Sequence, residues 1–249
     1  MFSVPLAQFI ERPQQSLLSY PDPDLSAERI LELEALGVTA IYNYGRCQLQ
    51  GWNYLGLGYC GLVLLVQYQD RPVALKARRV DAPQESLTRE AQMLALANRC
   101  QVGCQFLASS SNFLLMEFVA GRSLLDWLQT CKKLGISVVK SILTQLLHQA
   151  FRLDQLGLDH GNLRCVTEHA IITATQPVLL DFSSASTNRR PANITTLTQG
   201  LFWGTVVAKL LEMQGFRPHR EQVIEILRCY KQSPVQENFD QLLERIFSD

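Results

Sequence analysis

The first half of the chain carries short apolar or aromatic runs that are separated by glycines or by turn-forming residues. This pattern is typical of short strands joined by tight connections, and it predicts a small antiparallel sheet. The runs that we expect to form strands are Asn53–Leu55, Leu62–Tyr68, Val73–Ala77 and Phe113–Val119.

Two helices are expected in the same half. Over residues 84–98, Leu87, Ala91 and Leu94 recur at steps of three and four, which places them on one stripe of a helix. An earlier helix has a capping residue at its start and a glycine at its stop. Its expected cap is Ser26, and its expected stop is Gly37. Its apolar side is expected to contain Leu31, Leu33 and Leu36.

Beyond Gly121 the pattern becomes mostly helical. A long helix is expected from a cap at Ser137 to a stop at Gly157. The residues expected to face its core are Val138, Ile142, Leu146 and Leu153. Short strands are expected at Ala170–Ile172 and Val178–Leu180, and further helices at Thr196–Met213, His219–Lys231 and Phe239–Phe247.

A sheet-rich first half followed by a helix-rich second half predicts an α+β fold in two lobes. Residues 1–24 contain four prolines and are expected to pack as an arm without long regular structure. We therefore divide the chain into an N-terminal extension of residues 1–50, a sheet lobe of residues 51–119 and a mainly helical lobe of residues 120–249. The pattern leaves open whether the extension completes the sheet or shields one of its edges.

Composition and charge narrow the functional classes. The chain has 23 basic and 23 acidic residues, so no summed positive field favours nucleic acid as a partner. Its most apolar stretch, Leu55–Gln67, is interrupted by glycines and is shorter than a membrane span, and its start lacks the pattern of a secretory signal. Seven scattered cysteines suit a reducing compartment. We expect a cytoplasmic protein that binds neither nucleic acid nor membrane.

The run from Leu55 to Val63 has the pattern GxGxxGxV, with Gly56, Gly58 and Gly61. Dinucleotide-binding proteins share a similar spacing, but their glycines lead from a strand into a helix. Here the chain continues as a strand, so the pattern predicts a hairpin loop. Such a loop suits phosphates, because glycines allow positive φ and leave no Cβ between backbone N–H groups and an anion. A tight hairpin without a ligand is the alternative.

A lysine follows in the next expected strand, fifteen residues after Gly61. Alternate residues of a strand share a face, so Ala74 and Lys76 project together. Ala74 leaves room for the flat ring of a ligand, and Lys76 reaches the phosphates of the same ligand. A lysine at that depth needs an anionic partner, for which Glu90 on the inner side of the following helix is expected and Glu85 is the alternative. The simpler interpretation is an exposed lysine on the strand and an exposed glutamate on the helix.

These motifs resemble those of the protein kinases. Val73-Ala74-Leu75-Lys76 is similar to the VAIK strand of that family, and Arg89–Leu94 is similar to its αC helix. Leu114–Gly121 resembles the hinge between the two kinase lobes.

The resemblance implies a two-lobed kinase-like fold that binds ATP. In this fold the backbone groups of Glu117 and Val119 bind the adenine edge, and Met116 limits the pocket behind it. The residues that the resemblance assigns to the nucleotide are Gly56, Gly58, Gly61, Val63, Ala74, Lys76, Glu90, Met116, Glu117 and Val119.

Leu158–Leu163 occupies the place of the kinase catalytic loop but departs from its sequence HRDLxxxxN. Asn162 stands where the family has its catalytic Asp, and an asparagine accepts a hydrogen bond but is no base near neutral pH. Thr167 stands five residues further on, where the family has a metal-binding Asn. The resemblance implies that Asn162 orients the substrate hydroxyl and that transfer is slow. Asp159 is a less suitable base, because neighbouring residues of an extended loop point apart.

Asp181 ends an expected apolar strand and begins Asp181-Phe182-Ser183, which resembles the DFG motif with serine for glycine. The resemblance implies that Asp181 is the ligand of Mg²⁺ or Mn²⁺ held with the ATP phosphates. A capping Asp before a turn is the alternative. No APE motif follows, and the remaining helical stretch is short. In this short C-terminal part the chain resembles the RIO kinases and the small archaeal kinases of the tRNA-modification complex.

Three functions are consistent with these residues. The first is an atypical serine/threonine protein kinase that transfers the γ-phosphate of ATP weakly to an unidentified protein substrate. The second is a pseudokinase, a nucleotide-binding module whose state a protein partner reads. The third is a phosphotransferase that acts on a small molecule, because several such enzymes share the fold. We rank them in this order.

Overall fold

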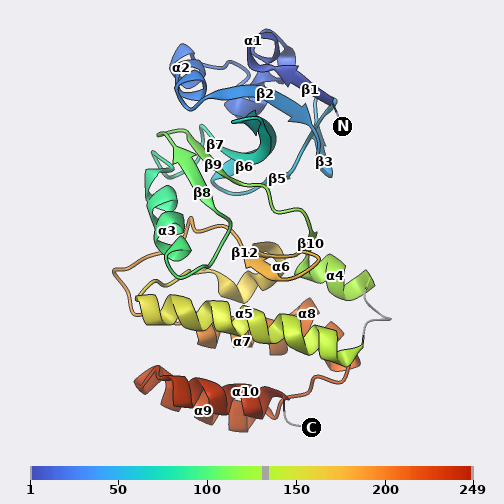
Figure 1. Ribbon diagram of the computed structural model, residues 1–249, viewed down its shortest axis with the longest axis vertical. Coiled ribbons are helices and arrows are strands. Elements are labelled where there is room, and N and C mark those ends of the chain that lie inside the picture. The colour runs from blue at the N-terminus through green and yellow to red at the C-terminus, as the bar shows by residue number, and fades with distance from the viewer. Residues whose placement is uncertain (1, 131–134, 248–249) are drawn as a thin grey trace. The chain divides into compact units, whose positions relative to one another are not determined.

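The computed structural model describes residues 2–130 and 135–247, and the chain divides into two compact units (Figure 1). The first contains Met1–Ala95 and Cys104–Phe118, and the second contains Leu96–Gly103 and Val119–Asp249. The first is built around an antiparallel sheet, whereas the second is mainly helical. The expected mixed α+β class is therefore confirmed. No helix of the described ranges is both long and apolar enough to cross a membrane.

One antiparallel sheet organises the first unit, and it has seven strands among the described residues. Six follow the order β1-β2-β6-β7-β9-β8, and β5 pairs with β6. The strands are β1 (Phe2–Pro5), β2 (Val38–Asn43), β5 (Gly56–Leu57), β6 (Gly61–Tyr68), β7 (Arg71–Arg78), β8 (Phe106–Ser109) and β9 (Phe113–Glu117). The remaining elements are the hairpin of β3 (Cys47–Leu49) and β4 (Trp52–Tyr54), α1 (Leu6–Phe9), the 3₁₀ helix η1 (Pro13–Leu18), α2 (Ala27–Ala35) and α3 (Thr88–Asn98).

The two faces of the central strands differ, because successive side chains of a strand point to opposite sides. One face, here called the core face, is buried with residues of the N-terminal segments. Its central residues are Leu62, Leu64, Val66, Val73, Leu75, Ala77, Phe113 and Leu115, in one apolar cluster with Phe9, Leu17, Leu18, Leu33 and Ile41. The opposite face, here called the site face, carries Val63, Ala74, Lys76 and Met116. The N-terminal segments thus cover one face and leave the other to predicted site residues.

Residues 1–50 complete the sheet. β1 pairs with β2 and β2 pairs with β6, so the extension adds two strands beside β6, and the expected arm includes a sheet strand. α2 begins as predicted, because the Ser26 hydroxyl accepts the Arg29 N–H at 3.3 Å. Gly37, with φ of 79°, follows its end. Leu31 is 64% exposed, so its predicted place on the apolar side is wrong.

A partly buried polar network joins α2 to the turn between β8 and β9. Glu32 accepts hydrogen bonds from the side chain and the backbone N–H of Asn112, at 2.6 and 2.9 Å, and from the Ser110 hydroxyl. Burial opposes ionisation of Glu32, but these hydrogen bonds outweigh it and hold its pKa below the ordinary value. Arg29 donates to Asn112 and to the Arg78 carbonyl oxygen, both at 2.9 Å. Burial lowers the pKa of Arg29 to about 10.

Helices make up most of the second unit, with a three-stranded sheet among its described residues. In Figure 1 the long helix α5 runs beside α7, and α9 and α10 pack on each other. The strands, in sheet order, are β10 (Arg122–Ser123), β11 (Ala170–Ile172) and β12 (Pro177–Leu179). The helices are α4 (Leu124–Thr130), α5 (Ile136–Leu156), the 3₁₀ helix η2 (Leu163–Cys165), α6 (Val166–His169), α7 (Asn193–Phe202), α8 (Val206–Met213), α9 (Arg220–Gln232) and α10 (Gln236–Phe247).

The long helix α5 ends as predicted but begins differently. Gly157 follows its last residue with φ of 76°, the left-handed conformation in which glycine ends helices. The N-cap is Gly135 instead of Ser137. Val138 is 43% exposed, so its predicted place in the core is wrong.

Other predicted elements of the second unit are partly correct. The strand expected at residues 170–172 is β11, and the next strand is shifted by one residue. The helix expected at residues 196–213 is two helices, because Gly204 with φ of 74° interrupts it. The Thr205 hydroxyl then caps α8 by accepting the Ala208 N–H at 3.0 Å.

Candidate functional site

The glycine-rich run forms a hairpin between two strands, as its pattern predicts. β5 and β6 pair in antiparallel register, with Gly56 opposite Val63. The Gly58 N–H donates to the Gly61 carbonyl oxygen at 2.8 Å, which closes the turn. Tyr59 at the tip is 75% exposed. The loop therefore has a fixed backbone and an open tip.

Close contact, and not positive φ, explains the glycine at position 61. None of the three loop glycines has a left-handed φ, so that part of the prediction is wrong. A Cβ at Gly61 would lie 2.9 Å from both the Ala77 carbonyl oxygen and Cγ of Lys76. A Cβ at Gly56 would meet no atom within 4 Å, and one at Gly58 would lie 3.7 Å from its nearest neighbour. Gly61 thus makes room for the lysine, while the other two leave open space.

Lys76 and Glu90 form a buried ion pair. Nζ of Lys76 donates to both carboxylate oxygens of Glu90, at 2.7 and 2.9 Å. The two side chains are 7% and 6% exposed. Glu90 lies in the first turn of α3, whereas Glu85 precedes that helix and is exposed, so the expected partner is the one observed. Because burial of two charges is costly unless their geometry is good, this bidentate contact is what keeps the ammonium group on the site face.

The site face brings together four of the predicted nucleotide-binding residues. In the antiparallel register Val63 is opposite Lys76 and Ala74 is opposite Met116, so these side chains project from one side of the sheet. Ala74 is buried, while Val63 and Met116 are partly exposed. A small apolar side chain therefore lies beside a fixed ammonium group.

Glu117, one of the two residues predicted to bind the adenine edge, is the last residue of β9. The Glu117 N–H donates to the Gln105 carbonyl oxygen at 2.8 Å, and the Glu117 carboxylate accepts the Gln105 N–H at 3.1 Å. These bonds fix the end of β9 against the segment that precedes β8. Val119 lies two residues further on and belongs to the second unit.

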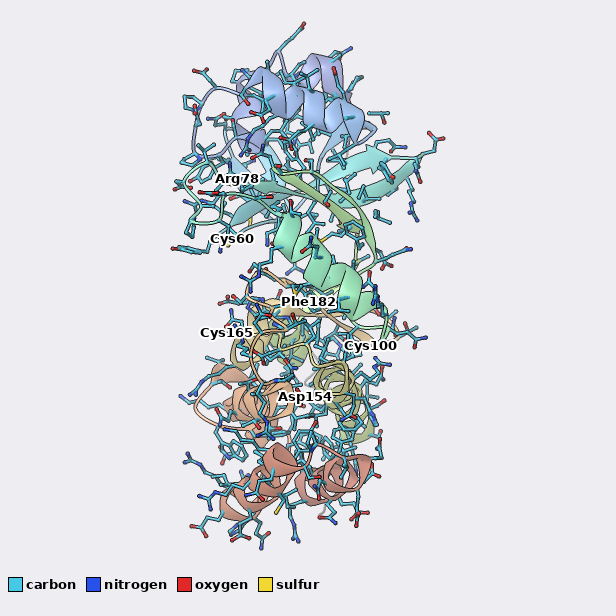
Figure 2. The ribbon with its side chains drawn as sticks, turned by 90° about the vertical axis from the view of Figure 1, so that its left-hand side faces the viewer. Cys60, Arg78, Cys100, Asp154, Cys165 and Phe182 are labelled. Atoms are coloured by element: carbon cyan, nitrogen blue, oxygen red, sulfur yellow. The ribbon has the colours of Figure 1, made fainter. Side chains whose placement is uncertain are left out.

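Buried side chains hold the predicted catalytic loop in the second unit. Asn193, fully buried at the start of α7, accepts the His160 N–H at 2.8 Å and donates to the Leu158 carbonyl oxygen at 2.7 Å. It also donates to Asp154 at 2.8 Å, and Asp154 accepts the Tyr230 hydroxyl at 2.9 Å. Figure 2 shows Asp154 among the helices of this unit, where burial raises its pKa. The loop backbone is therefore anchored to α5, α7 and α9.

Asp159 serves the structure of the loop itself. Its carboxylate pairs with Arg189 and accepts the Ala192 N–H at 3.0 Å, and it is 6% exposed. These contacts occupy the carboxylate, which argues against Asp159 as a base. Gly161 lies against the same arginine with φ of 85°, and a Cβ there would overlap the Arg189 guanidinium. The glycine in the HG sequence thus makes room for an arginine from further along the chain.

His160 is a buried imidazole that packs in the loop. Its Nε2 lies 3.1 Å from the Leu180 carbonyl oxygen, and its ring centroid lies 4.9 Å from that of Phe182, which Figure 2 labels. Burial lowers the pKa of His160 to about 4. The ring is therefore neutral near pH 7 and has a packing role.

Asn162 and Asp181 are connected through a third residue, His169. The Asn162 amide nitrogen lies 2.8 Å from Nε2 of His169, and Nδ1 of His169 lies 3.9 Å from Oδ2 of Asp181. His169 is the last residue of α6, directly before β11. The structure thus places His169 beside Asp181.

The backbone of Asp181 has an unusual conformation. Its φ of 64° is rare for a residue other than glycine. Its Oδ1 accepts the Ser183 N–H at 3.3 Å, which is the capping contact that the simpler interpretation expects. Its side chain is also 37% exposed, so the carboxylate has a side open to solvent.

The donors around Asp181 fit a cation that is bound together with a nucleotide. No group of three or more His, Cys, Asp or Glu side chains that could hold a metal converges within residues 2–130 and 135–247. Magnesium sites of nucleotide complexes need only one or two carboxylates from the protein, because phosphates and water supply the other ligands. Asp181, with His169 beside it, meets that requirement.

Three residues of this arrangement are missed by sequence reasoning: His169, Arg189 and Asn193. Their partners lie between 7 and 39 residues away along the chain, so no short motif joins them. The one available signal is at His169, a histidine directly before a predicted strand that runs beside the strand ending near Asp181.

Comparison of the sequence with protein-family models finds no match, and comparison with curated proteins finds none either. The interpretation of this site therefore depends on the contacts described above and on the resemblance of its motifs.

Proposed function

We propose that the chain is an ATP-binding protein with a two-lobed kinase-like fold that resembles the RIO kinases and the small archaeal kinases of the tRNA-modification complex. We further propose that it transfers the γ-phosphate slowly to a serine or threonine of a protein substrate. The observation that supports this most is the buried Lys76–Glu90 pair on the sheet face that adjoins the glycine hairpin. A fixed ammonium group near backbone N–H groups is suited to bind phosphates.

Each predicted residue has a defined part in this proposal. The hairpin N–H groups and Nζ of Lys76 bind the phosphates, and Ala74 lies under the adenine ring. The backbone groups of Glu117 and Val119 bind the adenine edge. Asp181 holds Mg²⁺ or Mn²⁺, which neutralises charge on the phosphates when bound.

In the transfer step the oxygen of the substrate hydroxyl attacks the γ-phosphorus. A new P–O bond forms, and the bond between the γ-phosphorus and the departing oxygen of ADP breaks. Asn162 accepts a hydrogen bond from the hydroxyl through Oδ1, and the hydroxyl proton leaves to water because an amide is no base. A missing general base costs roughly 10² to 10⁴ in rate, so we expect slow turnover.

A pseudokinase is the second candidate, and the contact between Asn162 and His169 favours it. The Asn162 amide already has a partner within the protein at 2.8 Å, and Asp159 pairs with Arg189. In this case the chain binds ATP, and a protein partner recognises the nucleotide-bound form.

Nucleotide binding is the first test. Calorimetric titration with ATP in Mg²⁺ or Mn²⁺ is compared between the wild type and Lys76→Ala. We expect saturable binding by the wild type and at least about tenfold weaker binding by the variant, because the phosphates lose a direct charge contact. Lys209→Ala, which removes an exposed lysine of α8, is the matched control and should bind normally. Equal binding by the wild type and Lys76→Ala contradicts the site.

Turnover separates the two candidates. Radiolabelled ATP is incubated with the protein alone and with candidate protein substrates, and both ADP and labelled protein are measured. A kinase gives slow transfer that Asp181→Ala abolishes and Asn162→Asp raises. Binding of ATP without any turnover in the wild type supports the pseudokinase.

A further inference from the structure

We propose that His169 is a metal ligand that holds the divalent cation of the nucleotide complex together with Asp181. The inference rests on the proposed function, because the nucleotide phosphates supply other ligands of the ion. It extends the sequence-based expectation, in which Asp181 is the ligand and Thr167 stands in place of a second one.

The backbone holds His169 beside Asp181. Ala170 at the start of β11 is opposite Leu179 at the end of β12 in their antiparallel pair. The Leu180 N–H then donates to the His169 carbonyl oxygen at 2.8 Å, one residue before Asp181. The two side chains therefore leave adjacent strand ends, and their closeness follows from the register of the sheet.

The separation of the two donor atoms admits one ion. Nδ1 of His169 lies 3.9 Å from Oδ2 of Asp181, which is too long for a hydrogen bond. Neighbouring ligands at about 2.1 Å from an octahedral ion are about 3.0 Å apart, so the exposed carboxylate would move about 1 Å closer to the imidazole when an ion binds. The histidine side chain is 7% exposed and the aspartate side chain is 37% exposed. The imidazole is thus held by the protein, while the carboxylate opens to the solvent from which an ion with its phosphates arrives.

Asn162 completes this arrangement by orienting the imidazole. Its amide lies 2.8 Å from Nε2 of His169, the ring nitrogen further from the carboxylate contact. A metal-binding histidine commonly donates its second ring N–H to a protein oxygen, which fixes the ring and its tautomer. The amide nitrogen, as placed, makes Nε2 the acceptor. With Nδ1 on the ion, Nε2 instead carries the proton, and the Asn162 amide presents its oxygen after a half-turn about its last bond. That oxygen has a second lone pair for the substrate hydroxyl. An asparagine therefore has a use at the position where the kinases have an aspartate.

A nitrogen ligand changes which ion the site prefers. Mg²⁺ favours oxygen ligands, whereas imidazole also suits Mn²⁺ and later transition metals. We expect the protein–ADP complex to bind Mn²⁺ more tightly than Mg²⁺. His169→Asn replaces the nitrogen with an amide oxygen and should reduce that preference by about tenfold.

Pulsed electron paramagnetic resonance of Mn²⁺ tests the inference directly. Mn²⁺ is added with and without ADP, and the electron spin echo is examined for modulation by a nitrogen nucleus bound to the ion. The samples are the wild type, the wild type labelled with ¹⁵N-histidine, and His169→Asn. We expect ¹⁴N modulation in the first, the ¹⁵N pattern in the second and neither in the third. The labelled sample separates histidine nitrogen from adenine nitrogen.

His219→Asn is the matched control, because it makes the same replacement at an exposed histidine just before α9 and should keep the modulation. Absence of nitrogen modulation in the wild type overturns the inference, and so does modulation that persists in His169→Asn. If His169→Asn does not fold, the labelled wild type decides, because a ¹⁴N signal unchanged by labelling excludes histidine.

The same samples distinguish a failure of this inference from a failure of the proposed function. ADP binding that depends on Lys76, with only oxygen ligands on Mn²⁺, overturns the role of His169 and leaves the nucleotide site intact. Nitrogen modulation in a protein that binds no nucleotide supports the cation site and refutes the ATP proposal.

Discussion

The two units hold their candidate site residues in different ways. In the first, Lys76 and Glu90 satisfy each other at 2.7 and 2.9 Å and are almost fully buried. In the second, His169 lies between Asn162 and Asp181, with its Nδ1 3.9 Å from Oδ2 of Asp181, and the Asp181 side chain is 37% exposed. Lys76 and Glu90 of the first unit are shielded from solvent, whereas the Asp181 carboxylate is partly exposed.

In the second unit, the contacts that support the backbone of residues 158–163 differ from those made by the candidate site residue Asn162. The buried groups Asn193 and Asp159 hold the loop backbone, and they would do so whatever residue stood at position 162. The side chain of Asn162, which projects from the loop, has a separate contact with His169 at 2.8 Å. This difference teaches that the position of a loop and the reactivity of its residues can be fixed by separate sets of contacts.

The largest expected effect comes from breaking the ion pair of the first unit. Lys76→Met should lower the free energy of unfolding by about 3 to 5 kcal/mol, because Glu90 stays buried after losing its cation. Urea unfolding followed by circular dichroism measures this. The double variant Lys76→Met/Glu90→Leu removes both charges and should regain most of the loss without regaining ATP binding. A loss below about 1 kcal/mol in the single variant would mean that the pair is not a buried one.

The next effect concerns the loop support of the second unit. Asn193→Ala removes hydrogen bonds to His160, Leu158 and Asp154, and we expect a loss of about 2 to 4 kcal/mol, since each buried group left unsatisfied costs about 1 to 3 kcal/mol. Tyr230→Phe, which removes one bond to Asp154, is the milder control at about 1 kcal/mol. Hydrogen exchange should show faster exchange in residues 158–163. Unchanged exchange there would show that other contacts hold the loop.

A smaller effect is expected at the glycine hairpin. Gly61→Ala places a Cβ 2.9 Å from Cγ of Lys76 and from the Ala77 carbonyl oxygen, and overpacking of this kind costs about 1 to 3 kcal/mol. It should also weaken ATP binding by displacing the lysine. Gly58→Ala has space, with its nearest atom at 3.7 Å, and should change stability by less than about 0.5 kcal/mol. Equal effects of the two substitutions would contradict the contact described for Gly61.

The smallest expected effect is a pH dependence in the α2 network. Hydrogen bonds from Ser110 and Asn112 hold the pKa of Glu32 below its ordinary value, so the ionised carboxylate favours the folded state. The stability difference between the wild type and Glu32→Gln should be constant above about pH 5. It should shrink as the pH falls below about 4.3, where the unfolded chain begins to bind the proton first. Urea unfolding at several pH values measures the difference, and a gap that does not change with pH would refute this assignment.

Sequence reasoning is most successful where the relevant signal is local. The hairpin of β5 and β6, the strand with Lys76 and the helix with Glu90 are each encoded by spacing within about fifteen residues. The pairing of Lys76 with Glu90 also follows, because the helical stripe of Leu87, Ala91 and Leu94 fixes which side of α3 faces the sheet.

It is less successful where the partner is distant in the chain. β2 is missed because its place depends on pairing with β6, about 25 residues later, and on β1, about 40 residues earlier. Arg189 and Asn193 are missed for the same reason, since their contacts depend on how α7 packs against the loop. Thr167 is reached by counting along a motif, whereas the observed contact with Asp181 comes from His169, the last residue of the one-turn helix α6.

The strands β1 and β2 set a limit on how this protein can be shortened. A chain that begins at residue 51 would expose the hydrogen-bonding edge of β6 and uncover the core face, including Leu62 and Leu64. An open strand edge next to bare apolar surface pairs readily with other chains. We therefore expect such a fragment to aggregate instead of folding as a smaller domain. Residues 1–50 are thus part of the minimal folding unit, and deletions that seek an isolated nucleotide site must spare them.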